Sequence, residues 1–145
     1  MDELMVTATI KEDQSDSVSS LCTIVKIGSY PLVNYENYSL AIDLIELART
    51  LVEDGDFFII TCSCGDAGCA GISKGIQVAR EQNTIHWHVH DYGRGIIHDQ
   101  TFVFNTEAYT TAVKRGLTEF MHLYEANPNI ETTPYLLHDR IEVTK

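Results

Sequence analysis

Residues 57–90 constrain the fold most strongly, because an apolar run, a loop rich in cysteine and glycine, and two alternating segments follow one another there. Residues 57–61 are too few for a helix and almost wholly apolar, which predicts a buried central strand. Residues 75–81 and 84–91 alternate between apolar and polar side chains, and only Gln82 and Asn83 separate them. Two alternating runs joined by so short a break predict an antiparallel hairpin.

The second alternating segment has one apolar face and one histidine face. The apolar residues are Ile85, Trp87 and Val89, and the histidines are His86, His88 and His90. One interpretation is a half-exposed strand whose solvent face consists of histidines. The other is a metal site, because alternate side chains on a strand reach the same ion and histidine is a common metal ligand. Both interpretations stay open.

The rest of the chain predicts further strands and two helices. Strands are expected at residues 4–11, 21–27 and 101–105, where apolar and β-branched residues are frequent. A first helix should begin after Ser39, an N-cap residue, and stop at Gly55. A second should begin after Asn105 or Thr106 and end before Pro128. After that helix, we expect an irregular segment or a final strand.

Together these elements predict an α+β fold, with an antiparallel or mixed sheet of about five to six strands and two main helices packed on it. The chain has 145 residues and contains no internal repeat or linker-like stretch. A single core commonly spans about 100–150 residues. We therefore expect one domain over residues 1–145.

The charge of the chain limits its partners. Ten Lys and Arg against 21 Asp and Glu give a formal net charge of −11. Such a field repels the phosphate backbone of DNA or RNA, so we expect no nucleic-acid partner. It attracts a basic protein, although an acidic surface also simply keeps a protein in solution.

The sequence also bears on location and on the state of the cysteines. The N-terminal residues lack the pattern of a secretory signal, and no stretch approaches the ~20 apolar residues that span a bilayer. We therefore expect a cytoplasmic protein with no membrane partner. Cysteines in that compartment are reduced or hold metal. Cys22 lies in a predicted strand and is expected to be a small buried residue.

Three cysteines, Cys62, Cys64 and Cys69, lie within eight residues and suggest a zinc site. Structural zinc usually has four protein ligands, so a histidine from the neighbouring strand would complete the set. His88 is the central candidate, with His86 and His90 as alternatives. The spacing C-x-C-x4-C differs from the paired C-x2-C of common zinc frameworks. The alternative is a tight glycine turn that holds small residues and no cofactor.

A reactive cysteine served by a histidine base is a third interpretation of the same loop. The sequence has no local signature of a cysteine protease, a zinc deaminase or a phosphate-binding loop. We therefore name no catalytic residue, and the sequence favours a protein that is not an enzyme.

Residues 57–115 resemble a group of small uncharacterised bacterial proteins. The shared pattern is a strand, the motif CxCGxxGCxG, a second strand and a strand with a central Trp, followed by Phe-x-Phe and a capped helix with an early Tyr. The matching positions are Cys62, Cys64, Gly65, Gly68, Cys69, Gly71, Trp87, Phe102, Phe104 and Tyr109. The three histidines are not part of that pattern. The resemblance implies a bacterial cytosolic protein and carries no established activity.

Two functional hypotheses follow. The first is a small acidic protein that acts by binding another protein, for example an immunity protein that neutralises a basic toxin. The second is a zinc-binding protein in which Cys62, Cys64, Cys69 and a histidine hold the metal, in a structural or catalytic role.

Overall fold

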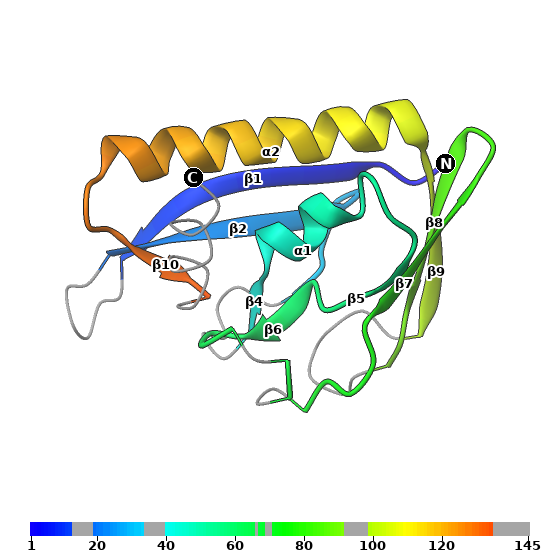
Figure 1. Cartoon of the computed structure of the whole chain (residues 1–145), viewed down its shortest axis with the longest axis horizontal. Coiled ribbons are helices and arrows are strands. Elements are labelled where there is room, and N and C mark those ends of the chain that lie inside the picture. Colours follow the sequence, from blue (N-terminus) through cyan, green and yellow to red (C-terminus); the bar gives the residue numbers. More distant parts are fainter. Residues whose placement is uncertain (13–18, 34–39, 66, 69–70, 92–98, 135–145) are drawn as a thin grey trace.

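The computed structural model describes residues 1–12, 19–33, 40–65, 67–68, 71–91 and 99–134. These residues form two helices and ten strands, and the strands belong to three sheets (Figure 1). The predicted α+β class is confirmed, as are the two helices and the mostly antiparallel pairing. The prediction of five to six strands is wrong. Five of the strands have only two or three residues, too few to give a periodic signal in the sequence.

The first sheet contains β1 (Leu4–Glu12), β2 (Ser19–Ile27), β3 (Tyr30–Pro31) and β10 (Glu131–Thr133). β2 is central and pairs antiparallel with β1 and β3. β10 pairs with β2 in the parallel direction. The two long strands confirm the predicted strands at residues 4–11 and 21–27, and β10 is the final strand expected after the second helix. Cys22 is buried on β2, as predicted.

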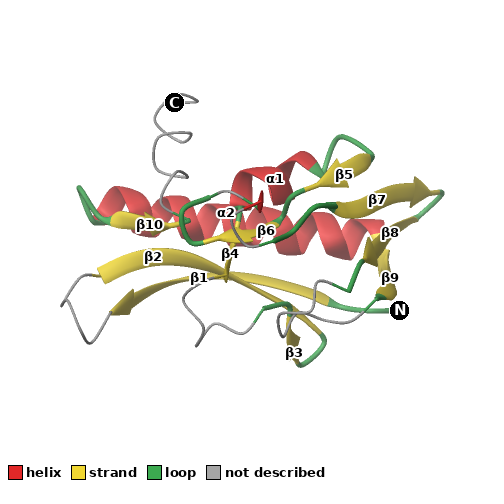
Figure 2. Cartoon of the chain, turned by 90° about the horizontal axis from the view of Figure 1, so that it is seen from below, coloured by secondary structure: helices red, strands yellow, loops and turns green. Residues whose placement is uncertain are grey.

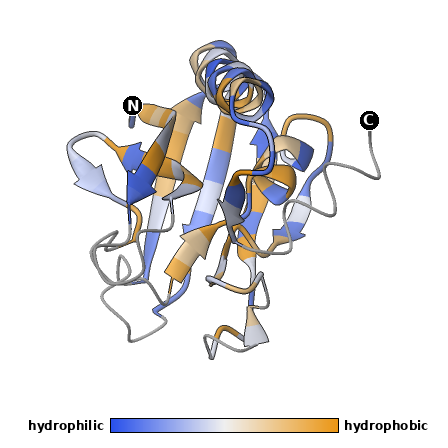
Figure 3. Ribbon diagram, turned by 90° about the vertical axis from the view of Figure 1, so that its left-hand side faces the viewer, coloured by the Kyte–Doolittle hydropathy of each residue, from blue (hydrophilic) through white to orange (hydrophobic). Residues whose placement is uncertain are grey.

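Helix α2 (Thr106–Ala126) lies along the length of β1 and β2. Figure 2 places α1 and α2 on the same side of these strands, and Figure 3 shows the strands on one side of α2. The side chains that α2 buries recur at helical spacing: Tyr109, Val113, Phe120 and Tyr124, with Gly116 at the centre. A methyl group on Gly116 would overlap Val6 of β1. Glycine therefore allows the helix and the strand to approach closely.

The first helix is shorter than predicted. α1 spans Leu44–Arg49, and the residues before it form β4 (Leu40–Ile42), which pairs with β6 (Ile60–Cys62). Asp43, rather than Ser39, caps α1, since its Oδ1 accepts hydrogen bonds from Ile45 N at 3.0 Å and Glu46 N at 3.1 Å. Ser39 lies outside the described residues. All three residues of β4 are buried, so their apolar character fits a central strand as well as a helix face.

The apolar run at residues 57–61 contributes residues to strands of two different sheets. β5 (Gly55–Phe57) pairs with β7 (Ile76–Glu81), whereas β6 begins at Ile60 and pairs with β4. The predicted single strand over this run is therefore wrong. β5 and β7 approach closely at Gly75, where an added methyl group would come within 2.8 Å of Phe57 N.

The third sheet has the order β5-β7-β8-β9 and contains the predicted hairpin. Its strands β7 (Ile76–Glu81) and β8 (Thr84–Val89) pair antiparallel across a turn in which Gln82 has φ 51°. β9 (Gln100–Asn105) follows and confirms the predicted strand at 101–105. Asn105 then caps α2, since its Oδ1 accepts a hydrogen bond from Ala108 N at 2.9 Å. The predicted start of the second helix is confirmed.

An aromatic cluster connects the third sheet to α2. The ring of Trp87 meets Phe104 edge-on at 5.3 Å and Tyr109 at 6.0 Å between centroids. Phe102 stacks on Phe104. All four of these aromatic residues are buried. Their role in this structure is to form the core.

Among the described residues, no helix is both long enough and apolar enough to cross a membrane.

Candidate functional site

The cysteine loop begins as a tight turn at the end of β6. Gly65 N donates a hydrogen bond to Cys62 O at 3.0 Å, which closes a four-residue turn from Cys62 to Gly65. Gly65 has φ 108°, a conformation that glycine adopts most readily. Cys62 is 8% exposed, whereas Cys64 is exposed. The turn therefore presents one thiol to solvent beside a buried one.

The two sulfurs lie close together. Cys62 Sγ is 2.7 Å from Cys64 Sγ, and Cys64 N donates a hydrogen bond to Cys62 Sγ at 3.3 Å. Two sulfurs that bind one tetrahedral zinc at ~2.3 Å lie about 3.8 Å apart, because the angle at the metal is near tetrahedral. A disulfide bond is about 2.05 Å long. The separation of 2.7 Å lies between these two values.

Of the predicted zinc ligands, Cys62, Cys64 and His88 are described, and Cys69 lies outside the described residues. In the part of the chain that the structure describes, no group of three or more His, Cys, Asp or Glu residues could hold a metal ion. The structure brings Cys62 and Cys64 together, and places His88 on β8 of another sheet. The zinc site with His88, His86 or His90 as fourth ligand stays a prediction.

The predicted alternation of β8 is confirmed. Ile85, Trp87 and Val89 are buried, while the three histidines are partly exposed on the other face. His88 Nε2 lies 2.6 Å from Asp99 Oδ1, and the rings of His88 and His90 are 4.6 Å apart. His86 Nε2 contacts Thr84 Oγ1 at 2.9 Å and Glu81 Oε2 at 3.4 Å. The histidine face thus forms a polar surface with local partners.

An acidic corner, which we define as Val52–Asp56, connects α1 to β5. It contains Glu53, Asp54 and Asp56, all exposed, and Val52, whose exposed fraction is 82%. Gly55 has φ 142° and turns the chain into β5. The corner therefore places one exposed apolar side chain next in the sequence to three exposed carboxylates.

Two arginines hold the acidic corner. Arg49 contacts Glu46 at 2.8 Å and Glu53 at 3.1 Å. From β7, Arg80 contacts Asp54 at 2.7 Å, and its guanidinium also donates to Glu53 O and Thr50 O. The hydrogen bonds from Arg80 lower the pKa of Asp54. These contacts connect the corner to both α1 and the third sheet.

Beneath the corner, a buried hydrogen-bond chain connects α1, α2 and β8. Thr50 Oγ1 donates to Leu47 O at 2.6 Å, so the Tyr109 hydroxyl donates to Thr50 Oγ1 at 2.6 Å. The same hydroxyl accepts a hydrogen bond from Trp87 Nε1 at 3.2 Å. Burial raises the pKa of Tyr109 to about 12. Tyr109 therefore stays neutral, and its hydroxyl hydrogen-bonds to Thr50, the C-cap residue of α1.

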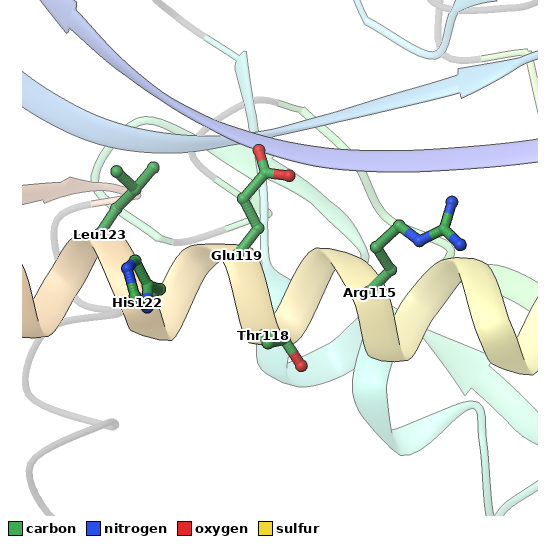
Figure 4. Close-up of a pocket in the computed structure, with 5 residues that line it drawn as sticks. All are labelled: Arg115, Thr118, Glu119, His122 and Leu123. Carbon is green, nitrogen blue, oxygen red and sulfur yellow. The ribbon is translucent and has the colours of Figure 1, made fainter.

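An open hollow runs along α2 beside β1. It is lined by Arg115, Thr118, Glu119, His122 and Leu123 (Figure 4). Glu119 extends toward β1, and its Oε1 accepts a hydrogen bond from Ala8 N at 3.0 Å. Glu119 thereby satisfies a backbone donor at the edge of β1, a common means of protecting an edge strand.

Sequence reasoning did not single out the acidic corner. The sequence VEDGD at residues 52–56 follows a helix and combines a glycine turn with three carboxylates, and this pattern could have identified it. The bracing by Arg80 could not be read from the sequence, since 26 residues separate it from Asp54.

No protein-family model, curated protein or solved structure matches the chain.

Proposed function

We propose that the protein acts by binding a basic protein, and that the acidic corner Val52–Asp56 contacts this partner. The observation that carries the proposal is the exposure of Val52, at 82%, among three exposed carboxylates. An apolar side chain with a charged rim combines contact area with charge complementarity, which steers association and selects the partner.

The charge of the corner supports a basic partner. The corner and α1 carry four carboxylates, on Glu46, Glu53, Asp54 and Asp56, against the guanidinium groups of Arg49 and Arg80. The local sum is negative, in keeping with the net charge of −11 for the whole chain. Positive groups on a partner would be attracted over roughly 8–10 Å at physiological ionic strength.

The contacts beneath the corner also support this function. Arg80 of β7 contacts Asp54 of the corner. Thr50 hydrogen-bonds to Tyr109, which in turn accepts a hydrogen bond from Trp87 in the core. A turn that is already held in place has less conformational entropy to lose when it binds. In its most concrete form, the proposal describes an immunity protein that neutralises a basic toxin.

Affinity capture tests the proposal. The wild-type chain is immobilised, and proteins retained from the source cells are identified at about 50 mM and about 500 mM salt, because charge-steered binding weakens as the Debye length falls. The same capture uses the double variant Val52→Ala/Asp56→Lys. We expect a basic protein that is retained by the wild type at low salt, released at high salt and lost with the double variant.

The matched control is Glu125→Lys, which makes the same charge change at an exposed position near the C-terminal end of α2. This variant should retain the partner. Equal loss of the partner with both variants would show that only total charge matters. Equal retention by all three proteins would contradict the proposed contact.

A further inference from the structure

The turn from Cys62 to Gly65 holds a pair of cysteines whose chemistry is independent of partner binding. Its two sulfurs lie 2.7 Å apart, one buried and one exposed. This arrangement differs from a single reactive thiol, because the buried Cys62 sulfur lies beside Cys64 Sγ and is in place to attack it and displace a thiol attached there. We propose that Cys62 and Cys64 form a thiol–disulfide exchange site, whose co-reactant is a low-molecular-weight disulfide such as oxidised glutathione.

Three features of the turn support the exchange. The hydrogen bond from Gly65 N to Cys62 O, at 3.0 Å, fixes the relative positions of the two cysteines. The hydrogen bond from Cys64 N to Cys62 Sγ, at 3.3 Å, orients that sulfur toward the turn. The exposure of Cys64 gives a small disulfide access to its sulfur, whereas Cys62 is only 8% exposed.

The reaction proceeds in two steps. The Cys64 thiolate attacks one sulfur of the small disulfide, the S–S bond of that reagent breaks, and one small thiolate leaves and takes a proton from water. The Cys62 thiol then loses its proton to water, and its sulfur attacks Cys64 Sγ. A bond forms between Cys62 Sγ and Cys64 Sγ, the mixed disulfide bond between Cys64 and the reagent breaks, and the second small thiolate leaves and takes a proton from water. In sum, the protein loses two hydrogens and the reagent is reduced to two thiols.

The third described cysteine provides an internal control. Cys22 is buried on β2, and burial raises the pKa of its thiol. Because the thiolate is the nucleophile, Cys22 should react far more slowly than Cys64. Serine in place of Cys22 should therefore leave the exchange unchanged.

The test treats the full chain with mixtures of oxidised and reduced glutathione, quenches with an alkylating reagent and locates the modified peptides by mass spectrometry. We expect a peptide containing residues 62–64 that has lost two hydrogens, and the same product in Cys22→Ser and Cys69→Ser. Cys62→Ser should instead accumulate a mixed disulfide between Cys64 and glutathione, because the resolving sulfur is missing. Cys64→Ser should show neither product.

Several results would overturn the proposal. A disulfide that includes Cys69, or that disappears in Cys69→Ser, would assign the chemistry to another pair. A wild-type protein that carries one zinc per chain by native mass spectrometry, and that reacts only after chelation, would make the two sulfurs ligands. If Cys62→Ser fails to fold, the position of the bond in the wild-type peptide decides the question alone, and unmodified Cys62 and Cys64 would refute it.

Discussion

At the scale of single residues, Tyr109 connects the core to the acidic corner. Replacing it with Phe removes the hydroxyl that accepts from Trp87 Nε1 and donates to Thr50 Oγ1. A buried donor left without a partner costs about 1–3 kcal/mol. We expect Tyr109→Phe to lower the free energy of unfolding by that amount in urea denaturation at neutral pH. An unchanged midpoint would show that the hydrogen-bond chain contributes nothing to stability.

The same residue predicts a pH dependence. Burial raises the pKa of Tyr109 to about 12, from 10.0. The folded state therefore favours the neutral phenol, and its contribution is complete below about pH 10 and is lost as the pH rises to about 12. Two pKa units correspond to about 3 kcal/mol. Between these pH values, the wild type should lose more stability than Tyr109→Phe, and parallel curves for the two proteins would contradict the assignment.

Gly116 tests the packing of α2 on β1. Alanine favours a helix over glycine by about 1 kcal/mol. The added methyl group would overlap Val6, however, and overpacking a core costs about 1–3 kcal/mol. We expect Gly116→Ala to be destabilising overall. Thr118→Ala is the control, since Thr118 is exposed on the same helix and should gain slightly from the better helix former. A more stable Gly116→Ala protein would show that the helix does not approach β1 as described.

At the scale of elements, Arg80 decides how firmly the acidic corner is held. Arg80→Gln removes the contact with Asp54 and the hydrogen bonds to Glu53 O and Thr50 O. We expect faster amide hydrogen exchange at Val52 and Glu53, whose N–H groups bond to Arg49 O. Lys114→Gln removes the same charge from an exposed site on α2 and should leave that exchange unchanged. Equal exchange in both variants would mean that Arg80 does not brace the corner.

The long elements could be predicted from the sequence, and the short ones could not. β1, β2, the β7–β8 hairpin and α2 each contain enough residues to show a period of two or 3.6. The apolar residues Leu40–Ile42 fit the predicted helix as well as a strand, because a buried three-residue strand and the start of a helix have the same composition. Only the pairing of β4 with β6 distinguishes the two, and that contact is distant in the sequence.

The candidate sites were predicted to different degrees. Spacing alone indicated that Cys62 and Cys64 would lie together and that the histidines would share one face of β8. The acidic corner depends on the exposure of Val52, which the sequence did not indicate. The bracing by Arg80 depends on the pairing of β5 with β7.

At the scale of the whole molecule, the net charge of −11 should govern how fast the partner binds. Surface plasmon resonance with the captured basic protein should show an association rate that falls at least tenfold as salt rises, with a smaller change in the dissociation rate. Val52→Ala should act mainly on dissociation, because it removes contact area and no charge. A salt-independent association rate would contradict electrostatic steering.

Hydrogen exchange of the wild-type chain, with and without the captured basic protein, tests most directly where that partner binds. The proposed function predicts slower exchange at Val52–Asp56, with little change along the exposed face of α2. Slower exchange confined to α2 or to the histidine face of β8, with the acidic corner unchanged, would contradict it.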